Sequence, residues 1–156
     1  MIKQAIGAVL ALSLLLLAGL ANAAVIDASE GGATVGDVQI YIGILPAQMI
    51  RGHPQAHSES SMHGGQPTAS DEFHIVIALF DAKSGTRIED ADVTARVSEI
   101  GLVGAEKKLE SMAIAGAVTY GNYFTMQGHG PFRISLTIHV PGRPQDVKAE
   151  FEHRHQ

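Results

Sequence analysis

The feature that most constrains the fold is a period of two in the apolar residues of several short segments. The clearest case is residues 132–140, where apolar and polar side chains alternate without interruption. The apolar set there is Phe132, Ile134, Leu136, Ile138 and Val140. This alternation is typical of a β-strand with one buried face, and no stretch shows a sustained helical period. We therefore predict an all-β protein, an immunoglobulin-like antiparallel β-sandwich with under about 10% helix.

Turn residues divide the chain into seven segments of strand length. Pro46 ends the first, and glycine or proline lies between most of the others. Residues 73–80 are almost continuously apolar, which is typical of a central strand covered on both faces. The predicted strands are 33–45, 73–80, 88–100, 107–114, 122–126, 132–140 and 147–151.

The N-terminal stretch has the pattern of a secretory signal peptide. Lys3 precedes an apolar run over residues 5–20, and Ala21-Asn22-Ala23 supplies small residues for cleavage. We predict a signal peptide over 1–23 and one domain over 24–156, which is long enough to bury a single core. No later run approaches the roughly 18 to 20 apolar residues of a membrane span. We expect the mature chain in the periplasm, with no membrane span after cleavage.

Composition excludes several kinds of site. With no cysteine, disulfides and thiolate ligands are absent, so any soft metal ligand must be methionine. Sixteen acidic residues against 11 basic ones argue against a nucleic-acid partner. The sequence has no Gly-x-Ser-x-Gly, no His-Glu-x-x-His and no phosphate-binding glycine loop, so we predict that the protein is not an enzyme.

Residues 50–72 form a polar loop, punctuated by glycine and proline, that carries potential metal ligands. They are His53, His57, Met62 and His63, with His74 just beyond. Imidazole together with thioether suits copper, because sulfur favours Cu(I) and imidazole serves both Cu(I) and Cu(II). Iron and zinc are the alternative metals. The ordinary interpretation is a solvated surface loop.

Several short motifs carry a resemblance to known families. Residues 74–85, 88–93, 121–126 and 130–134, together with Met112, resemble the YtkA-like and FixH-like periplasmic immunoglobulin-like domains. The chain is also similar to the periplasmic iron-transport-associated proteins, which accompany bacterial iron permeases and bind copper. In that family a tyrosine is followed by Pro-x-x-Met and Arg-Gly, and residues 41–52 match this order.

The resemblance implies a copper site. It assigns His74 as a strand-borne copper ligand, Met112 as a second ligand and Met49 as a methionine beside the site. Two family positions differ: Thr119 stands where the family has a histidine, and Val76 where it has an acidic residue. The loop histidines are the obvious replacements. We expect His74 and Met112 to meet at one end of the sandwich, closed over by the loop.

The remaining histidines and methionines are weaker candidates. Met126 and His129 are possible further ligands, although buried methionines usually fill gaps in a core. His139 alternates to the solvent side of its strand. His153 and His155 are predicted to lie in a frayed tail without a role.

Three functions remain open. The first is a periplasmic copper-binding protein, acting as a metal chaperone or as an accessory subunit of a metal-transport system. The second is a module that binds no metal and assists assembly of a membrane respiratory or transport complex. The third is a donor of iron or zinc. The partner is a membrane permease or a respiratory complex. Because the similar family is dimeric, we expect a homodimer.

Overall fold

The computed structural model describes residues 24–50 and 69–155, which form an almost entirely β structure. The predicted signal peptide lies outside the described residues. The helical elements in the described part are a short α-helix, α1, and one 3-10 turn, η1. In chain order the elements are β1 (Val25–Asp27), η1 (Ala28–Glu30), β2 (Gly32–Val35), β3 (Val38–Pro46), α1 (Ala47–Ile50), β4 (Glu72–Asp81), β5 (Asp92–Glu99), β6 (Ala105–Ile114), β7 (Ala117–Thr125), β8 (Phe132–His139) and β9 (Val147–His153).

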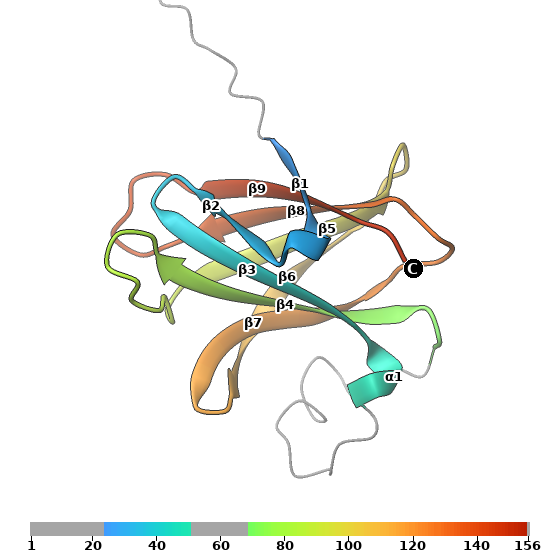
Figure 1. The fold of residues 1–156 in the computed structure, drawn as a ribbon, viewed down its shortest axis with the longest axis horizontal. Helices are drawn as coiled ribbons and strands as arrows, with labels where there is room; N and C mark the ends of the chain where they lie inside the picture. Colours follow the sequence, from blue (N-terminus) through green and yellow to red (C-terminus); the bar gives the residue numbers. More distant parts are fainter. Residues whose placement is uncertain (1–23, 51–68, 156) are drawn as a thin grey trace, which may run out of the picture.

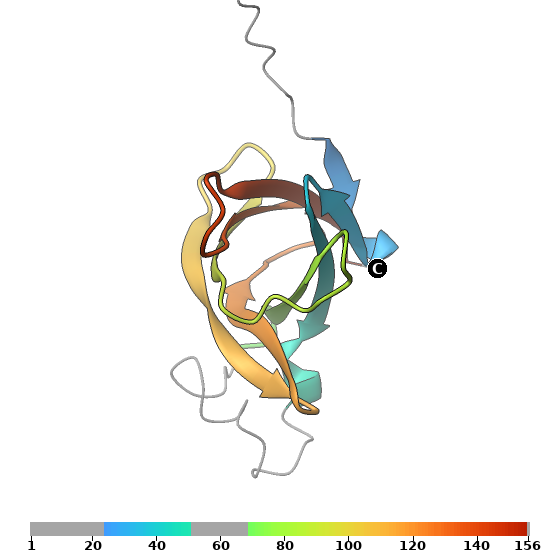
Figure 2. The ribbon, with the colours of Figure 1, turned by 90° about the vertical axis from the view of Figure 1, so that its left-hand side faces the viewer.

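The nine described strands form one strongly curved sheet in the order β1-β9-β8-β5-β6-β7-β4-β3-β2. Seen end on, the sheet curls into a nearly closed barrel, with the β2 and β1–β9 edges approaching each other (Figure 2). The predicted all-β, sandwich-like fold is confirmed. One pairing departs from the antiparallel prediction, because β1 runs parallel to β9.

The core follows from the alternation in the sequence. Every apolar member of the 132–140 pattern is buried, from Val140 at 7% exposed to Ile138 at 0%. On β4, Ile75, Ile77 and Leu79 are also fully buried and join the same core. The even-numbered residues of β4 therefore point to the outer face of the sheet.

Strand boundaries differ from the prediction in several places. The segment predicted as one strand over 33–45 is a hairpin, in which β2 and β3 pair across a turn. Gly36 has a φ of 61°, a left-handed conformation that glycine adopts without steric cost. The apolar residues change from odd positions at Val35 to even positions at Val38, and the prediction of a single strand overlooked this change. β7 begins earlier than predicted, at Ala117, and β1 was not predicted.

β6 joins the two layers of the sandwich. Its first half pairs with β5 and its second half with β7, so the strand passes from one layer to the other. Where β6 leaves β7, side chains replace backbone pairing. Asn122 Nδ2 donates to the Lys108 carbonyl at 2.8 Å, and Lys107 Nζ donates to the Tyr123 carbonyl at 2.6 Å.

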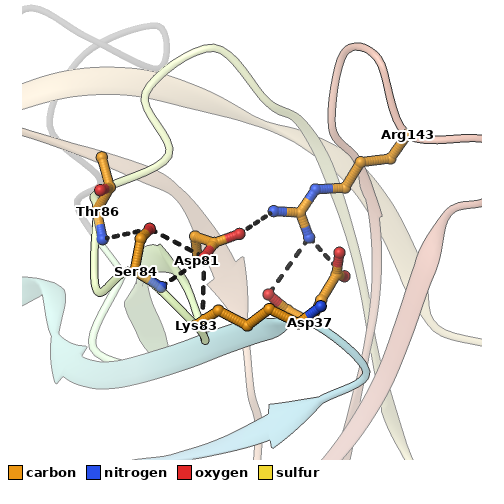
Figure 3. Close-up of polar contacts among 6 residues, drawn as sticks. All are labelled: Asp37, Asp81, Lys83, Ser84, Thr86 and Arg143. Carbon is orange, nitrogen blue, oxygen red and sulfur yellow. Dashed lines mark hydrogen bonds and ion pairs between the residues drawn. The ribbon is translucent and has the colours of Figure 1, made fainter.

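The end of the barrel where β3 begins and β4 ends is fastened by Arg143, from the β8–β9 turn. Its guanidinium forms ion pairs with Asp37 at 2.5 Å and with Asp81 at 2.9 Å, as Figure 3 shows. Asp81 also accepts hydrogen bonds from the backbone N–H groups of Lys83 and Ser84. Arg143 thus links the β8–β9 turn to the β2–β3 turn and to the turn after β4. We call this end of the barrel the arginine end.

Within the described residues, no helix has the length and apolar character needed to cross a lipid bilayer.

Candidate metal centre

His74, in β4, is a polar residue with a buried side chain. Within residues 24–50 and 69–155 it is the one polar side chain that is almost completely buried, with 1% of its surface exposed. It lies near the start of β4, opposite Leu45 of β3 and Tyr123 of β7. By strand alternation it points to the outer face of the sheet, away from the main core.

Met112 meets His74 above a glycine. A Cβ atom at Gly121 would lie 2.3 Å from Met112 Cε and 2.8 Å from His74 Nε2. The thioether methyl and the imidazole nitrogen therefore approach the same point from β6 and β4. Met112 is 3% exposed, yet it lies outside the main core cluster. Only glycine at position 121 leaves room for both groups.

Two further residues cover this part of the outer face. The Tyr123 ring lies 4.7 Å from the His74 ring at a tilt of 31°, and this contact restrains the imidazole plane. Ala47, the first residue of α1, packs against Tyr123 in a small cluster separate from the main core. Figure 1 shows α1 beside the start of β4. The buried part of the outer face thus coincides with the predicted ligand pair. We call this end of the barrel the histidine end.

Glu110 was missed by the sequence analysis. It lies opposite Gly121 and two residues before Met112, so its side chain is on the same face as the pair. It is exposed. The Glu-x-Met spacing on one strand was the signal available. Even so, no three His, Cys, Asp or Glu side chains in the described part of the chain are grouped so that they could hold a metal ion.

The loop candidates His53, His57, Met62 and His63 lie outside the described residues. Their segment starts after Ile50 at the end of α1, and the described chain resumes at Ala69. The two flanks of this segment are linked, because Gln48 Nε2 donates to the Ser70 carbonyl at 3.2 Å. Both flanks therefore lie at the end of β3 and the start of β4, next to His74.

The structure does not bring the other candidates to this pair. Met49 is in α1 with 65% of its surface exposed. Met126 is buried in the main core, on the opposite side of the sheet from His74. His129 is exposed in the turn between β7 and β8.

The prediction that His153 and His155 belong to a frayed tail is wrong. His153 is the last residue of β9, and the His155 ring stacks on Phe73 at a centroid distance of 4.3 Å. Burial lowers the pKa of His153, as does the nearby His155, whereas Asp27 raises it. The aromatic contacts that hold this tail form between segments distant in the sequence, so no local pattern predicted them.

Comparison with solved structures shows the same fold in proteins of low sequence identity. A copper-bound variant of FetP from uropathogenic Escherichia coli strain F11 is 15% identical, with a TM-score of 0.58 over 80% of this chain and 93% of that one. Copper-reconstituted P19 from Campylobacter jejuni is 12% identical, with a TM-score of 0.60 over 80% and 92%. A DUF4426 family protein from Pseudomonas aeruginosa PAO1 is 14% identical, with a TM-score of 0.59 over 81% and 95%.

These similarities establish the fold and nothing finer. No family model matches the sequence, and no curated protein matches it either. Membership of the YtkA-like or FixH-like domains therefore stays a prediction. The fold is nevertheless one that proteins with bound copper also adopt.

Proposed function

We propose that the protein is a periplasmic copper-binding protein in which His74 and Met112 supply a nitrogen and a sulfur ligand. The observation that carries the proposal is the approach of His74 Nε2 and Met112 Cε to one point over Gly121. Both side chains are buried, and an imidazole together with a thioether suits a copper ion better than a hard cation such as Mg²⁺.

Each residue of the pair has a separate role in this proposal. The Met112 sulfur would favour Cu(I), whereas the His74 nitrogen would serve both Cu(I) and Cu(II). Tyr123 would hold the imidazole in position through the ring contact at 4.7 Å. The pair alone leaves the coordination incomplete. We propose that His53, His57, Met62 or His63 add ligands, because their segment begins and ends beside His74.

The structural similarity to copper-bound FetP and P19 supports this function, as does the resemblance of the sequence to copper-binding periplasmic proteins. We propose that the protein passes copper to a membrane permease or respiratory complex, as a chaperone or an accessory subunit. We infer no catalytic activity. A homodimer remains our prediction.

A competition titration with a Cu(I)-specific chelator tests the proposal. His74→Ala removes the nitrogen ligand, and Met112→Leu removes the sulfur with little change in volume. Loss of a residue that only orients a ligand already costs about 10- to 100-fold in metal affinity, so each change should cost at least this much. His139→Ala is the control, because His139 is exposed at the end of β8 and pairs with Asp146 in the β8–β9 turn, away from the site. Equal affinities in all four proteins would overturn the proposal.

The second candidate function is an assembly or interaction module that holds no metal. It is favoured by the β5–β6 turn, where Ile100, Leu102 and Val103 are exposed at 46%, 65% and 102%. Aliphatic side chains this exposed are often protein contacts. Metal analysis of untagged protein purified from the periplasm separates the two functions. Copper well below one equivalent under both oxidising and reducing conditions would favour the module.

A further inference from the structure

A second cluster of potential ligands lies in a cleft on the other side of β4. The cleft has a volume of about 740 Å³ and lies where β1 and η1 face β9 and the ends of β3 and β4. Its lining includes Asp27, Phe73, His153 and His155. β1 pairs with β9 and η1 also contacts β9, so the N-terminal segment lies beside the last strand in this region. Phe73 and His74 are neighbours in β4 and point to opposite faces, so this cleft is separate from the pair at Gly121.

His155 is held in the orientation that metal-binding histidines commonly have. Its Nε2 lies 3.2 Å from the Met126 carbonyl oxygen, and a hydrogen bond there requires the proton on Nε2. The Nδ1 lone pair is then available to coordinate a metal ion. Metal-binding histidines usually donate their other ring N–H to a carbonyl or carboxylate in this way. Stacking on Phe73 at 4.3 Å and contact with Phe132 at 5.1 Å fix the plane of the ring.

His153 and Asp27 complete the cluster. The His153 ring lies 5.1 Å from the His155 ring, and the planes are almost perpendicular at 74°. Asp27 is on β1, which pairs with the end of β9, and its negative charge acts on His153. Its carboxylate is oriented by the Ser29 N–H at 2.8 Å. Two imidazoles and a carboxylate therefore line the same cleft.

We propose that His153 and His155 form an open site for a divalent cation of borderline softness, Zn²⁺ or Cu²⁺, with Asp27 as the adjacent carboxylate. Two nitrogens and an oxygen suit these ions, and the cleft offers no sulfur for Cu(I). Because no three such side chains in the described residues are already grouped around one point, the pair would bind the ion first. Water or a ligand carried by the ion would fill the remaining positions. This inference does not depend on copper binding at His74.

Zinc titration followed by nuclear magnetic resonance of the histidine rings tests the inference, using the complete mature chain. Zn²⁺ is the probe because it has no redox chemistry. We expect the ring signals of His153 and His155 to shift together below one equivalent of Zn²⁺, and to do so equally in the His74→Ala variant. Rings that stay unshifted at one equivalent in the wild-type protein would overturn the inference, whatever the variants do.

Two variants give a second measurement. His155→Phe keeps a flat ring for stacking on Phe73 but removes the nitrogen, and His153→Asn removes the other imidazole. Each should weaken the corresponding Zn²⁺ binding event about tenfold or more, whereas the control His139→Ala should leave it unchanged. An unchanged number of bound ions and unchanged affinity in the double variant would show that the two histidines only pack. Cu(I) binding at His74 can fail or succeed independently of this result.

Discussion

The arginine end and the histidine end of the barrel differ in the kind of side chain that they bury and in the contacts of that side chain. At the arginine end, the Arg143 guanidinium has two carboxylate partners, Asp37 and Asp81, and its side chain is 19% exposed. At the histidine end, a buried imidazole and the methyl end of a thioether pack over Gly121, which has no side chain to displace them. The charged Arg143 links three turns, whereas the histidine end places two potential metal donors beside each other.

This difference identifies the arginine end as a structural cluster and the histidine end as a candidate metal site. Opposite charges that satisfy each other stabilise the turns and leave little capacity for a ligand. Side chains that carry a nitrogen and a sulfur donor and pack over the same glycine are candidates for binding a metal ion. Substitutions at the arginine end should therefore lower the free energy of unfolding, and substitutions at the histidine end should lower copper affinity.

The largest effect should come from copper itself. Because a ligand that binds only the folded protein stabilises it by mass action, free copper at 1,000 times its dissociation constant should raise the free energy of unfolding by about 4.1 kcal/mol. Denaturant unfolding with and without Cu(I), and again after chelation, measures this. The same experiment on Arg143→Ala should show the same increment. An increment that disappears in that variant would mean that the two ends are not independent.

A methyl group added at Gly121 should damage the histidine end selectively. In Gly121→Ala the new Cβ would meet Met112 Cε at 2.3 Å and His74 Nε2 at 2.8 Å, so the Met112 methyl and the His74 ring must shift from their positions. We expect copper affinity to fall about 10- to 100-fold, as when a metal ligand loses its orientation. Chelator competition measures the change.

Gly43→Ala is the matched control for that experiment. Gly43 lies in register with Gly121 across Val76, but a Cβ there would meet nothing within 4 Å. It should leave copper affinity unchanged. Equal losses in both variants would point to a general effect of alanine on the sheet.

Removing the guanidinium should damage the arginine end. Arg143→Ala leaves two carboxylates close together without their cation, and we expect a loss of about 1–2 kcal/mol in the free energy of unfolding after allowing for partial exposure. Arg96→Ala is the control, because Arg96 and Glu106 form an ion pair with more than half of each side chain exposed. That variant should lose under about 1 kcal/mol. Copper affinity should be unchanged in both variants. A loss of copper affinity in Arg143→Ala would show that the two ends of the barrel are not independent.

The smallest expected effect is the pH dependence of stability that comes from Asp81. Hydrogen bonds from Ser84, and then from Lys83, lower the pKa of Asp81 below 3.8, and Arg143 acts in the same direction. The ionised carboxylate therefore stabilises the fold above pH 3.8, and this contribution is lost as pH falls through the lower, folded-state pKa. Asp81→Asn should be less stable than wild type near neutral pH, with the difference shrinking below pH 3.8. A difference that stays constant with pH would show that Asp81 acts through packing instead.

The sequence predicted the fold well because alternation is local. The buried face of β8 could be read residue by residue, and the apolar run in β4 indicated a central strand. The hairpin at Gly36 was missed because the change of the apolar residues from odd positions at Val35 to even positions at Val38 was overlooked. β1 was missed because its three residues gain their place only by pairing with β9.

The candidate site was predictable only in part. His74 and Met112 came from a resemblance between short motifs, but their meeting depends on Gly121, which neither composition nor spacing marked as special. The tail histidines were dismissed because the aromatic partners of His155, Phe73 and Phe132, are distant in the sequence. Contacts of this kind depend on how the sheet closes, so only the three-dimensional structure brings them into view.

X-ray absorption at the copper edge tests the central claim most directly. The spectrum of Cu(I)-loaded wild-type protein should contain both sulfur and nitrogen neighbours. In Met112→Leu the sulfur contribution should fall, and in His74→Ala the nitrogen contribution should fall, while Gly43→Ala should reproduce the wild-type spectrum. A wild-type spectrum with nitrogen and oxygen neighbours alone, or a sulfur contribution of the same size in Met112→Leu, would contradict a copper site built on His74 and Met112.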